Sequence, residues 1–279
     1  MTFVGITFNR LGFDMRTLLI SFLLAFAGSA IAAPIASVGN EAIDSSAVSY
    51  RLSTERAYGN SRMTDAVALV SLINDAIELE TAASLGIAPT ETEISDLANH
   101  AQQTTKAPAI LAKVKAIFGN DLGAYNRLYI SPKVVNRKLR EHHSNTAEIH
   151  QAEKAVADNV LSLASSGKTF EEIADETTAT VSSFDVPVNS DSSLTSILSA
   201  LSVDSFHPGV IEDDSSYMVV RLTAKDSEKF TVEALRIQKK SFDEWFRGIA
   251  NGISIQIQNQ QLRQSIQSNY SGIWWTSNL

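Results

Sequence analysis

A strictly alternating apolar and polar segment lies near the C-terminal end of the chain. Residues 253–258 read Ile-Ser-Ile-Gln-Ile-Gln, which is the two-residue period of a β-strand with one buried face. A single strand can neither bury that face nor satisfy its backbone hydrogen bonds. Two short apolar pieces within residues 35–43, on either side of Gly39-Asn40-Glu41, are candidate partner strands. We therefore expect a hairpin at 35–43 that pairs with residues 253–258, so that the two ends of the mature chain meet.

The segment that follows the hairpin carries helical signals only. Asp44-Ser45-Ser46 offers N-cap side chains, Thr90-Glu91-Thr92-Glu93 is a capping box, Gly86 suits a helix C-terminus, and Pro108 suits a first turn. Asn120 and Ser131-Pro132 are further candidate starts. We expect an all-helical domain over 45–143, with helices at 47–58, 64–85, 90–101, 108–118, 120–129 and 131–139. The helix at 64–85 has apolar residues on more than one face, which predicts a central position in the core.

A smaller mixed region follows. Asn145-Thr146-Ala147-Glu148 is a second candidate capping box, opening a helix that Gly167 ends, and a short helix follows from Thr169. We expect a polar, turn-rich stretch at 182–193, a helix at 194–201 and a strand at 217–222. Apolar residues at three- and four-residue steps between Leu235 and Ile249 predict one more helix.

These elements suggest a mainly α chain with a small α+β unit. The expected division is a helical domain at 33–144, a small domain at 145–226, and a helix and strand at 227–258 that return to the first domain. The last segment, 259–279, is rich in Gln, Ser and Asn, and we expect it to be loosely held. Phe242 and Trp245 are expected to clamp the C-terminal helix to the helical domain.

Residues 15–33 resemble a cleavable export signal. Arg16 precedes the apolar run Leu18–Ala27, and the small-residue site Ala30-Ile31-Ala32 follows. A retained membrane anchor is the alternative, but the run is shorter than the roughly 18–20 apolar residues needed to cross a bilayer. We expect residues 1–32 to be removed, with either Met1 or Met15 as the start, and a periplasmic product without stable membrane insertion. The chain has no cysteine, so core packing must stabilise it in place of disulfides.

Composition and motifs argue against several function classes. The formal net charge of −8 provides no basic surface for phosphates, so nucleic acid is not an expected partner. We find no hydrolase, cofactor or phosphate-binding motif and expect neither a cofactor nor catalytic residues. The five histidines are expected to be solvated surface residues. His143 and His150 would share a helix face only in an unbroken helix, so no metal site is expected.

The pattern as a whole resembles the SurA/PrsA family of exported chaperones and parvulin-type peptidyl-prolyl isomerases. The resemblance covers most of 35–143 and 228–258. It rests on the start at 35–43, the helix at 72–82, its exit Leu85-Gly86-Ile87-Ala88-Pro89-Thr90-Glu91-Thr92-Glu93-Ile94, and Phe242-Asp243-Glu244-Trp245 with the alternating strand. It implies a SurA N-terminal-like helical domain that binds unfolded polypeptide and is completed by the C-terminal segments.

The middle region is similar to a reduced parvulin domain. Residues 152–174 are similar to the family's helix-Gly-x-x-Phe-x-x-Ile-Ala stretch, and residues 203–208 with 217–220 are similar to its closing strands. The histidine-bearing first strand is absent, however, because 147–150 belongs to a helix. Residues 181–193 replace the Gly-Gly-x-Leu-Gly loop, and Met218 stands where the family has its second histidine. We therefore expect isomerase activity to be lost.

Three functions remain open. The first is a chaperone that holds unfolded envelope or outer-membrane proteins without catalysis. The second is a prolyl isomerase with an altered site, and the third is a non-catalytic docking subunit of an envelope assembly. For the first, the resemblance implies an apolar peptide-binding cradle bordered by Phe118, Tyr125, Leu128 and Tyr129, while packing of these residues in the core is the default interpretation.

Overall fold

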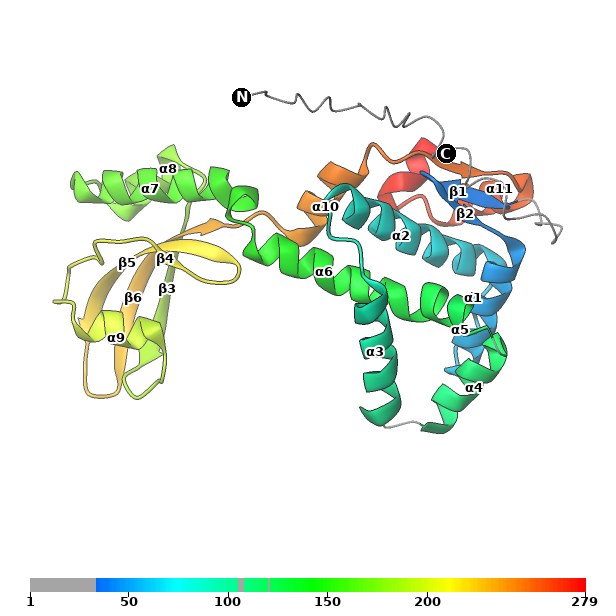
Figure 1. The fold of residues 1–279 in the computed structure, drawn as a ribbon. Coiled ribbons are helices and arrows are strands. Elements are labelled where there is room, and N and C mark those ends of the chain that lie inside the picture. The colour runs from blue at the N-terminus through cyan, green and yellow to red at the C-terminus, as the bar shows by residue number, and fades with distance from the viewer. Residues whose placement is uncertain (1–33, 105–107, 120) are drawn as a thin grey trace, which may run out of the picture.

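The computed structural model describes residues 34–104, 108–119 and 121–279, which form two lobes joined through helix α6 (Ser131–Asn145) (Figure 1). The helical lobe comprises the elements from β1 to α6 together with α10 to η3. The small lobe comprises α7 to β6. The chain is thus mainly helical with a small α+β part, as expected. The export signal expected at 1–32 lies outside the described residues.

The two ends of the described chain pair in one small sheet. Strands β1 (Ala36–Val38), β2 (Glu41–Ile43) and β7 (Ile255–Ile257) are antiparallel in the order β2-β1-β7. Ser37 lies opposite both Ala42 and Gln256. Gly39 adopts φ 54° in the hairpin turn, where a Cβ atom would come 2.9 Å from the side chain of Glu80. The pairing expected from the alternation at 253–258 is confirmed.

Four helices follow the hairpin at nearly the expected positions. They are α1 (Ser45–Ala57), α2 (Asp65–Ser84), α3 (Glu91–Thr104) and α4 (Pro108–Phe118). Asp44 caps α1 by accepting a hydrogen bond from the backbone N–H of Ala47. The Thr90–Glu93 capping box also forms, since the Glu93 N–H donates to Thr90 Oγ1 at 3.2 Å and the Thr90 N–H donates to Glu93 Oε2 at 2.7 Å.

The next helices differ from the expectation because they are continuous. Helix α5 (Leu122–Tyr125), the π-helical turn η1 (Asn126–Ile130) and α6 follow one another without a break. Asp121 caps α5 through the N–H of Ala124. Asn120, which was expected to begin this helix, lies outside the described residues. Ser131-Pro132 begins α6 from an already helical Ile130, so it does not open a separate helix.

The second capping box does not form. Asn145 is the last residue of α6. The backbone N–H of Thr146 donates to the carbonyl of His142, in the last turn of this helix, at 3.0 Å. A short 3₁₀ helix, η2 (Ala147–His150), then leads into α7 (Gln151–Ser165). Helix α6 therefore continues to Asn145, and the next α-helix begins only at Gln151.

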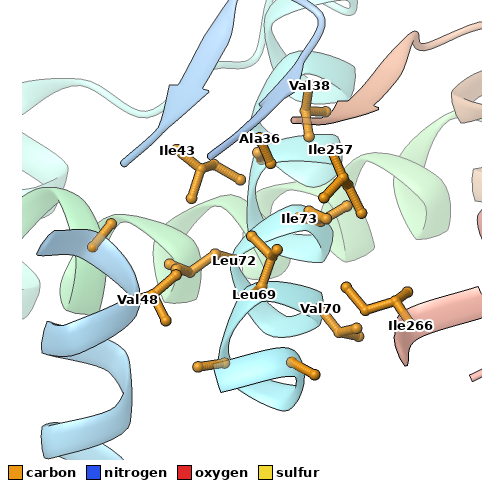
Figure 2. Close-up of a cluster of buried hydrophobic side chains, with 14 of the residues drawn as sticks. Ala36, Val38, Ile43, Val48, Leu69, Val70, Leu72, Ile73, Ile257 and Ile266 are labelled. Atoms are coloured by element: carbon orange, nitrogen blue, oxygen red, sulfur yellow. The ribbon is translucent and has the colours of Figure 1, made fainter. Parts of the chain in front are cut away.

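Helix α2 is the centre of the main core, as its apolar faces predict. Leu69, Leu72 and Ile73 of α2 are at most 4% exposed. Figure 2 shows these side chains between the small sheet, helix α1 and the C-terminal segment. Among the described residues, no helix combines the length and apolar character needed to cross a bilayer.

The small lobe is built around a four-stranded antiparallel sheet. Its elements are α7, α8 (Phe170–Glu176), β3 (Thr180–Pro187), α9 (Ser193–Ser199), β4 (Ile211–Glu212), β5 (Ser216–Lys225) and β6 (Lys229–Gln238), with strand order β3-β6-β5-β4. Helices α7 and α8 cover one face, where Phe170 of α8 packs with Val219 and Leu235 of the sheet. Helix α9 covers the other face, where its Leu198 packs with Phe230. Gly167 ends α7 with φ 94°, as expected.

Two predictions for this lobe were wrong. The stretch expected to be a polar loop contains strand β3, and the first part of the helix expected between Leu235 and Ile249 is strand β6. Strand β6 alternates buried Phe230, Val232 and Ala234 with less buried residues. The helical spacing of apolar residues between Leu235 and Ile249 obscured this two-residue period. The β5–β6 hairpin also spans the boundary that was placed between residues 226 and 227.

The C-terminal segment is folded against the helical lobe. Helix α10 (Phe242–Ala250) packs Trp245 against Ala82 and Leu139, which confirms the expected clamp. Beyond β7, helix α11 (Gln260–Asn269) and the 3₁₀ turn η3 (Trp274–Asn278) lie over α2. The prediction of a loosely held tail was wrong, because Trp275 is 0% exposed and its Nε1–H donates to Asn74 Oδ1 at 2.7 Å.

Candidate functional site

The helical lobe contains an open groove of about 550 Å³. Residues of α1, α2, α4, η1 and α6 line it. They are Arg51, Thr54, Glu55, Tyr58, Asp75, Glu78, Phe118, Leu128, Tyr129, Pro132, Lys133 and Asn136. A volume of this size is typical of a site for several side chains or a small ligand.

The four aromatic and apolar residues singled out from the sequence lie together, but in two layers. Tyr125 is 1% exposed and Phe118 4% exposed. Tyr125 stacks on Tyr129 with ring centroids 5.4 Å apart and meets Phe118 edge-on at 5.5 Å. Phe118, Leu128 and Tyr129 line the groove, whereas Tyr125 supports them from behind.

Tyr58, which the sequence pattern did not single out, also lines the groove and contacts Tyr129. Its side chain is 47% exposed, and its ring stacks on Tyr129 with centroids 6.3 Å apart. The two hydroxyl groups are in hydrogen-bond contact. Burial and this contact raise the pKa of the Tyr129 hydroxyl. The ammonium of Lys133 lies 3.7 Å from the centre of the Tyr129 ring, which is a favourable cation–π position.

Arg51 fixes the wall of the groove at the π-helical turn. In an α-helix, the carbonyl of Leu128 would accept a hydrogen bond from the N–H of residue 132. Residue 132 is a proline and has no N–H, so this bond is missing. Arg51 Nη2 donates to this carbonyl at 3.0 Å, and Arg51 Nη1 donates to Ser71 Oγ at 3.1 Å. The same guanidinium pairs with Asp75, whose pKa is raised by burial against the opposing effect of Arg51. One side chain therefore ties η1 to α1 and α2.

Glu78 and Asn136 connect this groove to a second one. The second groove, of about 380 Å³, runs between α2, α6, α10 and the C-terminal segment, and both residues line both grooves. Asn136 Nδ2 donates to Glu78 Oε1 at 3.0 Å. Burial raises the pKa of Glu78 to about 7, with a further increase from Asp75 and opposing effects from Asn136 and Arg140. The charge in the middle of the combined groove therefore changes near neutral pH.

The raised pKa of Glu78 predicts a stability effect. Because the folded state holds this proton more tightly than the unfolded state, ionisation of Glu78 destabilises the fold as the pH rises from the unfolded pKa towards 7. We expect Glu78→Gln to increase the free energy of unfolding by about 1–3 kcal/mol near pH 8 and by much less near pH 5. Urea unfolding at both pH values tests this. An equal effect of the substitution at the two pH values would contradict it.

The small lobe offers no comparable arrangement around Met218. This side chain is 5% exposed and packs among Leu198, Val220 and Phe230 on the α9 face of the sheet. Met218, which stands where the parvulin resemblance places a second histidine, is therefore part of an apolar core. Residues 147–150 form the 3₁₀ helix η2, as expected in place of a first strand.

One of the two histidines at the junction of the lobes, His150, is buried, contrary to expectation, whereas His143 is partly exposed. His150 is 4% exposed, and its ring lies 4.9 Å from that of His143. His150 Nε2 is 3.2 Å from the backbone oxygen of His143, and His143 Nε2 is 3.0 Å from that of Lys240. The chain bends between α6 and α7, which brings the two rings together without a continuous helix. Within the described part of the chain, no group of three or more His, Asp or Glu side chains is arranged to hold a metal ion.

Comparisons with protein-family models, with curated proteins and with solved structures found no match to this chain.

Proposed function

We propose that this protein is an exported, non-catalytic chaperone of the SurA/PrsA type that holds unfolded envelope or outer-membrane polypeptides in the periplasm. The observation that carries the proposal is the groove of the helical lobe, where Tyr58, Leu128 and Tyr129 present apolar and aromatic surface in an open site that the buried Phe118 also lines. The family resemblance of the sequence supports the same function. The small lobe is then a parvulin-like domain that has lost its catalytic histidines.

The chemistry of the groove suits a binder that accepts many sequences. Aromatic faces bind apolar side chains of almost any shape, with little demand on orientation. Glu55 and Lys133 line the same groove and can hydrogen-bond the backbone N–H and carbonyl groups of an extended chain, which are present in every polypeptide. Specific recognition of one side chain is not needed for this activity.

An aggregation assay tests the proposal. The chain from Ala33 is added to an outer-membrane β-barrel protein diluted from urea, and light scattering is followed. We expect the chain to delay aggregation, and Tyr58→Ala/Tyr129→Ala to reduce apparent client affinity by about tenfold, because aromatic anchors dominate such surfaces. The control is Leu122→Ala, since Leu122 is 60% exposed and does not line the groove. If the unmodified chain does not delay aggregation, the proposed function is wrong.

A further inference from the structure

Strand β3 is an outer strand of the small-lobe sheet. It pairs with β6 over its whole length, from Thr180 opposite Arg236 to Pro187 opposite Lys229. No described strand pairs with its other side, and Figure 1 shows it at the margin of the sheet. One edge of an eight-residue strand is thus left without a strand partner among the described residues.

The register identifies the backbone groups at this edge. The N–H of Val188 donates to the carbonyl of Glu228 at 2.9 Å, which continues the β3–β6 ladder by one residue. In an antiparallel pair, residues bonded to the partner alternate with residues whose N–H and C=O point away from it. Since Val188 is bonded to β6, the same alternation applies to the residues before it. The backbone N–H and C=O groups of Val181, Ser183 and Asp185 therefore point towards the open edge.

Protection against strand addition is present at only one end of this edge. Proline and charged side chains are the usual means by which proteins block an exposed edge. Here Pro187 lies at the end of β3, and Asp185 is engaged by Lys229 at 2.7 Å and by the Thr231 hydroxyl at 2.9 Å. Residues 180–184 contain no charged side chain, and Val181 is 38% exposed.

We propose that the edge of β3 around Ser183 binds an extended polypeptide segment, which adds to the small-lobe sheet as a fifth strand. The free N–H and C=O groups of Val181, Ser183 and Asp185 are spaced to match those of an extended chain. Affinity then comes from main-chain hydrogen bonds, so the site accepts many sequences. This surface is separate from the groove of the helical lobe and does not depend on its function.

A second copy of this chain is a poorer occupant than an unfolded segment. Antiparallel pairing of two β3 strands centred on Ser183 would place Val181 of each copy opposite Asp185 of the other, an apolar side chain against a carboxylate. Each copy also has a formal net charge of −8, which opposes association. An unfolded polypeptide can instead present whichever register fits.

The direct test uses a short synthetic peptide of alternating threonine and valine with lysine at both ends. We expect amide hydrogen exchange at Val181, Ser183 and Asp185 to slow when the peptide is added to the chain from Ala33. A matched peptide that is N-methylated at its central residues cannot donate hydrogen bonds from either edge, and it should bind at least about tenfold more weakly. Protection elsewhere but not at these amides, or equal binding of the two peptides, would overturn the proposal.

Substitutions at Ser183 give a second test. Ser183→Pro removes the outward N–H without removing a bond to β6, a position that edge strands tolerate, whereas Ser183→Ala keeps the N–H. We expect the proline variant to bind the peptide about tenfold more weakly and the alanine variant to bind it normally. Tyr58→Ala/Tyr129→Ala should bind it normally too, which separates this site from the groove. Equal affinities of the two Ser183 variants, or sedimentation showing a β3-mediated dimer, would refute the proposal.

Discussion

Replacing Trp275 with alanine is expected to lower the free energy of unfolding by about 3–5 kcal/mol. Trp275 is 0% exposed, and it packs with α2 in the main core. The substitution removes the largest fully buried side chain of the described residues. It also removes the indole N–H that donates a hydrogen bond to Asn74 Oδ1. A cavity of this size next to α2 cannot close, since α2 is fixed by contacts on several sides.

Urea unfolding monitored by circular dichroism measures this loss, and Trp274 provides the matched control. Trp274 is the same residue type in the same 3₁₀ turn, but it is only partly buried and lines the edge of the second groove. We expect Trp274→Ala to cost about 1 kcal/mol, in line with its smaller burial. Equal losses for the two variants would contradict the deeper burial of Trp275, and a loss below about 1 kcal/mol for Trp275→Ala would mean that this side chain does not contribute to the core.

The second large effect is expected at Arg51. Arg51→Met keeps much of the side-chain volume but removes the partner of Asp75 and the donors to Leu128 and Ser71. The side chains of Arg51 and Asp75 are 15% and 25% exposed. Loss of one partner of a buried pair costs about 3–5 kcal/mol, and partial exposure reduces this to about 2–4 kcal/mol near neutral pH.

The pH dependence distinguishes loss of the ion pair from loss of packing. Burial already raises the pKa of Asp75, and without Arg51 its carboxyl should protonate more readily. A protonated carboxyl needs no cationic partner, so the destabilisation by Arg51→Met should be smaller near pH 4 than near pH 8. Asp75→Asn in the Arg51→Met background should restore part of the stability. A destabilisation that is the same at both pH values would indicate that Arg51 acts through packing alone.

The sequence predicted those parts of the fold that depend on local signals. Capping side chains placed α1 and α3, and the alternation at 253–258 correctly predicted the pairing of β7 with β1. The misassigned segment at 235–249 contained a similar signal that was overlooked. Ser241 and Glu244 form a capping box that begins α10, so the chain before Ser241 could not belong to that helix.

The missed features depend on contacts between distant residues. Strand β3 is weakly apolar because it is an edge strand, and only its register with β6 reveals it. The C-terminal segment has a polar composition, yet Asn259 caps α11, and Ile266 and Trp275 are both 0% exposed in the main core. In the groove, the family resemblance pointed to the aromatic cluster. Its charged and polar partners were not, because Arg51, Asp75 and Asn136 come from three different helices.

Site-specific photo-crosslinking gives the most direct test of client binding in the groove. A photoreactive phenylalanine analogue is placed at Tyr58 in the groove or at Val203 in the small lobe, and an unfolded outer-membrane protein is added. The two native side chains are each 47% exposed, so accessibility alone predicts equal crosslinking. The proposed function predicts strong crosslinking from position 58, reduced by Tyr129→Ala, and little from position 203. Equal yields at both positions, or no crosslink from position 58, would contradict a client-binding groove in the helical lobe.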